Sequence, residues 1–168
     1  MKLLAHISDD KTRTQTIEEH LTSTAALAGN FAAAFGAQAE AAYTALLHDI
    51  GKYSAGFQQR LQGGPPVDHS TAGAKAAIQD GNIPAALAIA GHHSGIPDLG
   101  NPHDTADEST LVGRSKRRIE DCSQWKQEIS PAKAALPPWL LRQPDNLTMA
   151  FFTRMLYSSL VDADFIDT

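Results

Sequence analysis

The adjacent pair His48-Asp49 has the clearest chemical potential in this sequence. It follows the apolar residues Leu46 and Leu47 and precedes Ile50-Gly51-Lys52, which places it at the edge of a predicted core. Burying an imidazole and a carboxylate is costly unless the two groups are paired or bind a metal ion. Histidine and carboxylate ligands with open coordination positions are typical of hydrolytic metal centres. The pair therefore predicts a metal site.

Further candidate ligands lie on separate predicted helices, mostly near helix ends. They are His20, His69, His92, His93 and one of the two carboxylates Asp162 and Asp164. Helical bundles build metal sites in this way, from side chains that converge from facing helices. The set exceeds the needs of one metal ion, so we expect two ions that share Asp49, an arrangement that activates water and stabilises the leaving oxygen of a phosphodiester. Lys52 is expected to hold a phosphate oxygen as a point charge.

Each candidate also has a purely structural interpretation. His20 alone is compatible with a core histidine, Asp49 with a hydrogen-bond acceptor at a helix end, and Asp68-His69-Ser70 with a helix cap. His92-His93 is compatible with a surface pair. The joint placement of these histidines at helix edges favours a site. His6 and His103 lack such a context, so we expect both at the surface.

Composition indicates one helical domain over residues 1–168. Hydrophobic residues make up 42% of the chain and aromatic residues only 7%. Many of the other hydrophobic residues are alanines, which favour packed helices. The net charge of −5 argues against a surface that is basic overall, but a metal site and a local basic patch can still attract nucleic acid. A single cysteine, Cys122, and the lack of a signal peptide or bilayer-length apolar run lead us to expect a cytoplasmic protein without membrane contact. The absence of a helix cap at Thr168 favours a piece of a larger protein.

Periodicity and capping signals predict the elements that position these residues. Helices are expected over residues 16–35, 38–50, 68–79, 84–90, 108–129 and 147–165, with loops over 54–66 and 101–107 and a turn-rich connection over 131–144. Thr16 and Glu19 have the spacing of a capping box at the start of the first helix. The expected surface helix over 108–129 carries Lys116, Arg117 and Arg118, which form either a solvated face or a nucleic-acid contact.

These motifs, taken in order, resemble the HD phosphohydrolase superfamily. More narrowly, the chain resembles the HD nuclease domain of the CRISPR-associated nuclease-helicase of type I systems. The resemblance rests on five segments: His20, the motif 48–52, Asp68-His69-Ser70 with Ala72-Gly73, Gly91-His92-His93-Ser94-Gly95, and Asp162-Ala163-Asp164-Phe165. The last two of these segments are the most specific.

The resemblance implies a compact helical bundle with two divalent transition-metal ions, Fe, Mn, Co or Ni, with Mg also compatible. It assigns one ion to His20, His48, Asp49 and Asp164, and the other to Asp49, His69, His92 and His93. Asp49 and Lys52 would be the catalytic residues, and the family's small-Asp-aromatic pattern favours Asp164 over Asp162. Asp162 and Asp164 lie about 200° apart around a helix, so only one of them can face the site.

The resemblance also implies a substrate and partners. Such domains cut single-stranded DNA without ATP, and a helicase domain or subunit feeds them the strand that an RNA-guided CRISPR surveillance complex displaces. A second interpretation is a nucleotide or cyclic-dinucleotide phosphohydrolase of the wider superfamily, which would need a closed pocket. A third is a non-catalytic metal-binding docking module, whose metal would be fully coordinated by protein.

Overall fold

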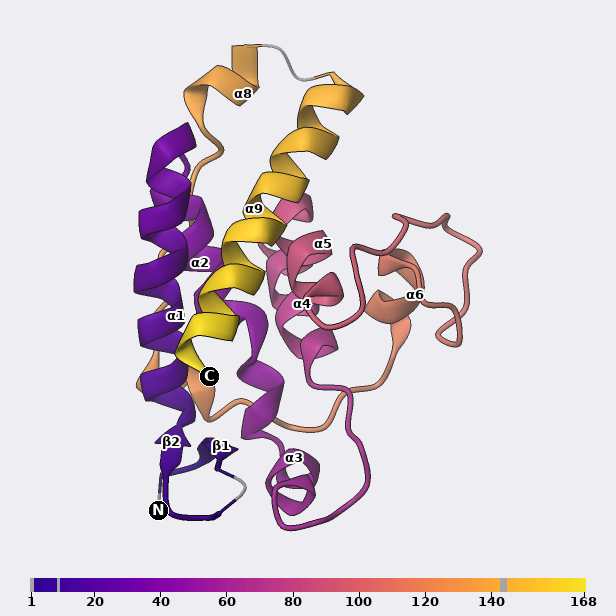
Figure 1. Cartoon of the computed structure of the whole chain (residues 1–168). Coiled ribbons are helices and arrows are strands. Elements are labelled where there is room, and N and C mark those ends of the chain that lie inside the picture. The colour runs from indigo at the N-terminus through magenta and orange to yellow at the C-terminus, as the bar shows by residue number, and fades with distance from the viewer. Residues whose placement is uncertain (1, 9, 143–144) are drawn as a thin grey trace.

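A computed structural model describes residues 2–8, 10–142 and 145–168, and it confirms the predicted all-α fold class (Figure 1). The helices are α1 (Ile17–Ala32), α2 (Gln38–His48), α3 (Ala55–Arg60), α4 (Ser70–Gln79), α5 (Ile83–Gly91), α6 (Leu111–Lys116), α7 (Trp125–Glu128), α8 (Pro138–Arg142) and α9 (Asn146–Asp167). Two 3-10 turns, η1 (Ala33–Phe35) and η2 (Ile50–Tyr53), follow α1 and α2. A small antiparallel hairpin of β1 (Leu4–Ile7) and β2 (Thr14–Thr16) precedes α1.

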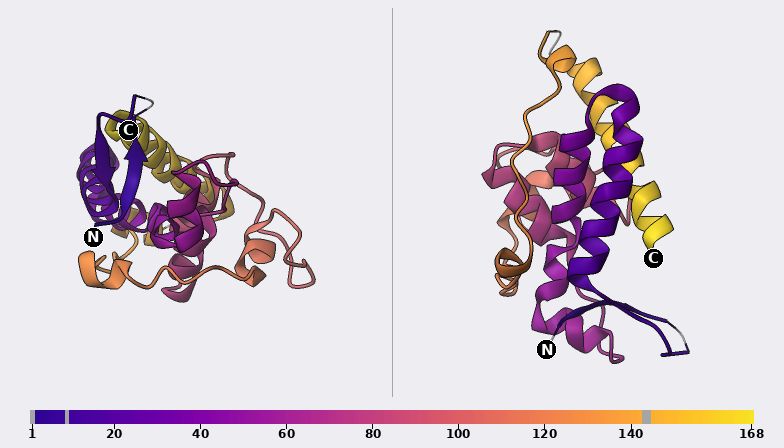
Figure 2. Two further views of the ribbon diagram at one scale, coloured as in Figure 1. Left: turned by 90° about the horizontal axis from the view of Figure 1, so that it is seen from below. Right: turned by 90° about the vertical axis from the view of Figure 1, so that its left-hand side faces the viewer.

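The long helices pack into one bundle around an alanine-rich core. Helix α1 contacts α2 and α9, α5 contacts α4 and α9, and α2 contacts α5 (Figures 1 and 2). Leu21, Tyr43, Ile89, Phe152 and Leu156 are fully buried between them, together with many alanines. The small alanine side chains let these helices approach closely. The hairpin and α3 lie at one end of the bundle, beside the C-terminal end of α9 (Figure 2).

The predicted capping box at the start of α1 is confirmed. The Thr16 hydroxyl accepts a hydrogen bond from the Glu19 backbone N–H at 3.2 Å, and the Glu19 carboxylate accepts one from the Thr16 backbone N–H at 3.0 Å. Two of the unpaired N–H groups at the helix start are thereby satisfied. This cap fixes where α1 begins, and hence where His20 lies along it.

Two glycines allow the segments around α2 to meet closely. A Cβ atom at Gly73 would collide with the carbonyl oxygen of Leu47, and one at Gly51 would collide with that of His69. Helix α4 therefore passes against the last turn of α2, and η2 passes against the start of α4. This contact brings His48-Asp49 next to His69.

Three predicted segments differ from the structure. The single helix expected over 108–129 is wrong: α6 ends at Lys116, and the backbone turns extended at Arg117, whose side chain donates to the carbonyls of Ala106 and Glu108. The loop expected over 54–66 contains α3, which the Ser54 hydroxyl caps. The connection expected over 131–144 contains α8, and its residues 143–144 lie outside the described residues.

The N-terminal hairpin was not predicted. Its strands have only four and three residues, too few to give a clear alternating pattern. None of the helices in the described part of the chain combines the length and the apolar character that crossing a membrane requires.

Candidate metal centre

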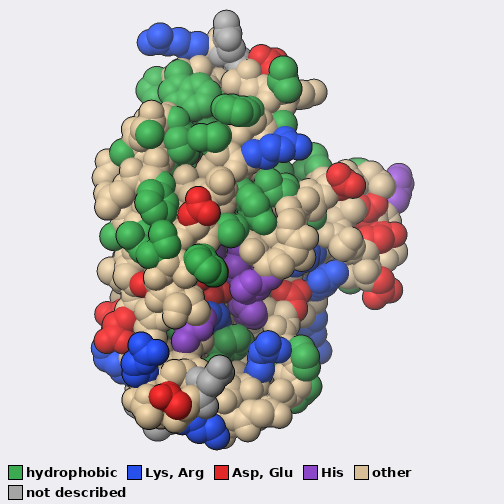
Figure 3. Space-filling view, viewed as in Figure 1, with side chains coloured by type: hydrophobic (Ala, Val, Ile, Leu, Met, Phe, Trp, Pro, Cys, Tyr) green, Lys and Arg blue, Asp and Glu red, His purple; other side chains and the backbone are tan. Residues whose placement is uncertain are grey.

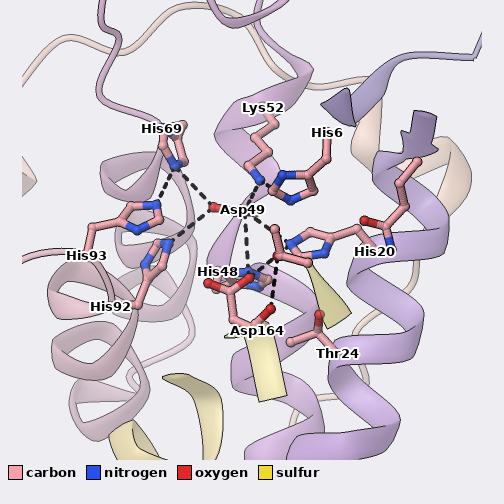
Figure 4. Close-up of polar contacts among 12 residues, drawn as sticks. His6, His20, Thr24, His48, Asp49, Lys52, His69, His92, His93 and Asp164 are labelled. Atoms are coloured by element: carbon pink, nitrogen blue, oxygen red, sulfur yellow. Dashed lines mark hydrogen bonds and ion pairs between the residues drawn. The ribbon is translucent and has the colours of Figure 1, made fainter. Parts of the chain in front are cut away.

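The structure brings all seven predicted ligands together, with Asp49 at their centre (Figure 4). They come from α1 (His20), the end of α2 (His48 and Asp49), the start of α4 (His69), the end of α5 (His92 and His93) and the last turns of α9 (Asp164). Asp49 itself follows α2 as its C-cap, with φ −118° and ψ 20°. The change from α-helix to the 3-10 turn η2 at this residue directs its carboxylate into the middle of the cluster.

One group of candidate ligands surrounds the Oδ2 oxygen of Asp49. His20 Nε2 lies 3.3 Å from Asp49 Oδ2 and 3.3 Å from Asp164 Oδ1. His48 Nε2 lies 3.3 Å from Asp49 Oδ2 and 3.5 Å from Asp164 Oδ1. The four side chains thus offer two imidazole nitrogens and two carboxylate oxygens to one point, all within 4.8 Å of one another.

A second group surrounds the other carboxylate oxygen, Asp49 Oδ1. His69 Nε2 lies 3.4 Å from it and His92 Nε2 lies 3.3 Å from it. His93 Nε2 approaches His69 Nε2 at 2.8 Å and completes the group. Because each oxygen of Asp49 faces a different set of histidines, this carboxylate has the geometry of a bridge between two ions.

Oxygen atoms behind the imidazole rings fix which ring nitrogen faces the centre. The Nδ1 atoms of His48 and His92 lie 2.7 Å from the carbonyl oxygens of Ala45 and Ile89. His69 Nδ1 lies 3.2 Å from the carbonyl of Val67. Since a carbonyl only accepts, Nδ1 carries the hydrogen in each ring, and the Nε2 lone pair of a neutral ring points at the centre. Metal-binding histidines are oriented in this way.

The donor atoms at the centre fit a divalent metal. At the centre, His20 Nε2, His48 Nε2, His92 Nε2 and both carboxylate oxygens of Asp49 are buried without a hydrogen-bond partner among the described residues. Burying unpaired polar atoms is costly, and cations between the imidazoles and the carboxylate would satisfy them. Imidazole with carboxylate is the ligand set of first-row transition metals. Each of the two groups could therefore hold a divalent metal ion.

The histidines and carboxylates of the cluster shift one another's pKa values. Burial lowers the pKa of His48, but the nearby Asp49 and Asp164 carboxylates outweigh burial and raise this pKa to about 10. Burial raises the pKa of Asp49, but His48 and Lys52 outweigh burial and hold it well below its usual value. Asp164 likewise has a lowered pKa, because His20 and His48 outweigh its burial. The carboxylates are therefore charged, and the imidazoles and the Lys52 ammonium beside them favour that form.

Lys52 belongs to the inner wall of the centre. Its side chain is only 4% exposed, and its Nζ atom lies 2.6 Å from Asp49 Oδ2. It also lies 2.9 Å from His6 Nε2 and 5.5 Å from the centre of the Phe57 ring. The ammonium is thus held at the centre by neighbours on several sides.

The expectation for His6 is wrong. It is not a free surface residue: its ring lies 4.7 Å from that of His20, and burial followed by the charge of Lys52 lowers its pKa to about 4. No motif marks it in the sequence, because the short strand that carries it has no clear pattern. His103 is exposed, as expected.

Asp167 is a second residue that the sequence did not reveal. It accepts hydrogen bonds from His20 Nδ1 at 2.7 Å, from Gln15 Nε2 at 2.8 Å and from the Ser23 hydroxyl. It therefore orients His20 as the backbone carbonyls orient the other rings. Its position three residues after Asp164 on one helix face was the available signal. Asp162 is exposed, whereas Asp164 lies beside His20 and His48 in the first group.

Comparison with known families is consistent with this geometry. The HD domain family matches residues 17–125, which is more than half of the chain. The chain belongs to the HD domain family. No curated protein matches it. Membership indicates a metal-dependent phosphohydrolase. The matched part of this HD domain includes His20, the His48-Asp49 pair, His69 and His92-His93, whereas Asp164 lies beyond it.

Proposed function

We propose that this HD domain is a metal-dependent nuclease that hydrolyses phosphodiester bonds of single-stranded DNA. The observation that carries the proposal is the Asp49 carboxylate, whose two oxygens face two separate groups of metal-binding side chains. Two-ion centres with a shared carboxylate are suited to in-line displacement at phosphorus, because both the attacking and the leaving oxygen need stabilisation.

The accessibility of the centre favours a polymer over a small nucleotide. His93 is exposed and the side chain of His69 keeps 14% of its surface, so the second group opens outward. Histidines are visible in a hollow of the face shown in Figure 3, with Lys and Arg side chains gathered over the lower part of that face. An open site lets a chain pass across it, whereas a nucleotide phosphohydrolase would enclose its substrate.

In this mechanism His20, His48, Asp49 and Asp164 would hold one ion, and Asp49, His69, His92 and His93 would hold the other. Bound divalent ions supply Lewis-acid chemistry, which makes water a stronger nucleophile and stabilises the leaving oxygen. The protein fixes the ligand geometry through Asp167 and the carbonyls behind the rings. Lys52 donates a hydrogen bond to a non-bridging phosphate oxygen and offsets the charge that develops there.

We also propose that the domain acts in CRISPR defence. The supporting features are the Gly91–Gly95 and Asp162–Phe165 motifs, which resemble those of the type I nuclease-helicase. Its partners would then be a helicase domain or subunit and an RNA-guided surveillance complex that supplies the displaced strand. The domain needs no ATP of its own.

A cleavage assay on metal-stripped protein tests the nuclease. Labelled single-stranded DNA, duplex DNA and a cyclic dinucleotide are incubated with Mn, Fe(II), Co, Ni, Mg or Zn in turn, without ATP. We expect metal-dependent cleavage of the single strand, and its loss in Asp49→Ala with the helical circular dichroism unchanged. Preferential hydrolysis of the cyclic dinucleotide would favour the nucleotide phosphohydrolase, and tight metal binding without any hydrolysis would favour the docking module.

A further inference from the structure

His6 reaches the centre from the N-terminal hairpin without belonging to either ligand group (Figure 4). Its Nε2 atom lies 2.9 Å from Lys52 Nζ, and its ring meets that of His20 edge-on, at 76° between the planes. A lysine ammonium only donates hydrogen bonds. His6 Nε2 must therefore accept, and Nδ1 carries the ring hydrogen.

Two acceptors restrain the ammonium of Lys52. One is Asp49 Oδ2 at 2.6 Å and the other is His6 Nε2 at 2.9 Å. A lysine side chain is long and flexible, so the second partner further restricts where its ammonium lies. With two partners, one N–H of Nζ is left over, and the described residues provide no third acceptor for it. That N–H is free for an acceptor that comes from outside the protein.

The hairpin is built to bring His6 to this position. The Gln58 side chain exchanges two hydrogen bonds with the backbone of Leu4, and it also donates to the carbonyl oxygen of Lys52 at 2.9 Å. A break in the strand register between Leu4 and His6 lets the consecutive residues Ala5 and His6 both turn toward the protein. Such bulges re-aim side chains beside functional sites. Gln58 thus ties the strand that carries His6 to the turn that carries Lys52.

We propose that His6 is a positioning residue that holds the Lys52 ammonium in place for contact with a phosphate oxygen of the substrate. The inference rests on the proposed function, because it assigns Lys52 a phosphate to contact. His6 itself touches neither the substrate nor the ions. It acts through its hydrogen bond to Lys52, which adds to the ion pair with Asp49 and arranges the ammonium before the substrate arrives.

Variants of the pair test this role through kinetics. His6→Leu removes the acceptor and should lower kcat by about 10- to 100-fold, the loss typical of a misplaced catalytic group, with KM and bound metal nearly unchanged. His6→Gln keeps an acceptor oxygen near the position of Nε2 and should restore most of kcat. The double variant His6→Leu/Lys52→Met should be no slower than Lys52→Met alone, because both changes remove one interaction.

His103→Leu is the matched control, since His103 is exposed, and it should keep full activity. Full activity of His6→Leu would overturn the proposal. A double variant whose kcat falls by the product of the two single losses would also overturn it. The same holds if His6→Gln fails to recover kcat despite a normal melting temperature.

An NMR measurement provides a readout that does not depend on hydrolysis. In the metal-free protein, long-range proton–nitrogen correlations should show His6 with hydrogen on Nδ1, and Lys52→Met should shift the Nε2 resonance. The opposite tautomer would overturn the proposal. The expected tautomer together with no cleavage of any phosphodiester would instead overturn the proposed function and the phosphate contact, while the His6–Lys52 hydrogen bond would stand.

Discussion

At the scale of single residues, Asp49 combines a backbone role with a chemical one. As the residue that ends α2, it leaves helical geometry, and its two carboxylate oxygens then face different histidines. A residue one position earlier would remain within the helix, where its direction is fixed by the helix axis. His48 and Asp49 are adjacent in the sequence because both lie at this helix end. His48 belongs to the first group, and Asp49 faces both groups.

The two acidic residues near the end of α9 give a direct test of the first ligand group. Asp164→Ala removes a carboxylate that lies 3.3 Å from His20 Nε2, so the protein should lose one of the two proposed ions. Asp162→Ala alters an exposed carboxylate on the same helix and should keep both ions. Elemental analysis after gel filtration measures the stoichiometry. Equal metal content in the two variants would remove Asp164 from the site.

At the scale of elements, the cluster depends on where helices begin and end. Helix α4 begins at Ser70, and Asp68 accepts hydrogen bonds from the Thr71 backbone at 3.1 Å and its hydroxyl at 2.7 Å. Arg117 donates to the same carboxylate at 3.1 Å from the chain that follows α6. These contacts outweigh burial and lower the pKa of Asp68. They fix the helix start that carries His69.

Substitutions at the neighbouring residues Arg117 and Arg118 test whether each arginine stabilises the fold or contacts nucleic acid. Arg117→Ala removes the contacts with Asp68 and with the carbonyls of Ala106 and Glu108, so the free energy of unfolding should fall by about 1–2 kcal/mol. Arg118→Ala changes an exposed side chain and should stay within about 0.5 kcal/mol of the wild type. Urea denaturation measures both.

Arg117 and Arg118 form a basic cluster with Lys116. Lys116 also donates to backbone carbonyls, those of Pro102 at 2.8 Å and Asp104, so this cluster is not a single solvated helix face. An equal loss in the free energy of unfolding for the two variants would contradict the structural role of Arg117. Weaker binding of single-stranded DNA by Arg118→Ala, with a shallower salt dependence, would identify a phosphate contact.

At the scale of the whole molecule, the candidate centre ties together most of the bundle. Its ligands come from α1, α2, α9 and the segments next to α4 and α5. Ions that bind only the folded state stabilise it by mass action. The carboxylates that repel one another in the metal-free protein would then be joined across the bundle.

Metal addition should therefore raise the melting temperature of the stripped protein. At about 100 times the dissociation constant, the gain in free energy of unfolding should be roughly 2.7 kcal/mol per site. Differential scanning calorimetry with Mn²⁺ measures it, and a chelator should reverse it. The Asp49→Ala variant is the control and should respond weakly. An equal response of the variant would place the ions elsewhere.

How much of this arrangement the sequence predicts depends on whether the signal is local. The capping box at Thr16, the stop at Gly36 and the proline near the start of α5 are local, and the helices follow them. The clustering of the histidines was also predictable, because several His and Asp residues placed together at predicted helix ends favour a shared site. Which group each residue joins was implied by the family resemblance, and not by spacing.

The non-local features escaped prediction. His6 reaches the centre because Gln58 and the Ala5 bulge hold the hairpin, and neither contact leaves a pattern in the sequence. The expected helix over 108–129 ends at Lys116, and from the extended backbone that follows, the Arg117 side chain bonds the Ala106 carbonyl and Asp68. In both cases tertiary contacts override local propensity.

The distribution of the ligands along the chain also sets the order in which the centre can be completed during synthesis. A ribosome makes the chain from its N-terminus, so all four side chains of the Asp49–His69–His92–His93 group emerge well before Asp164. Helix α9 also supplies Phe152 and Leu156 to the core. A nascent chain that has not yet released α9 thus lacks both the Asp164 carboxylate of the candidate centre and the core packing that α9 supplies, so the centre is completed only after α9 has been made.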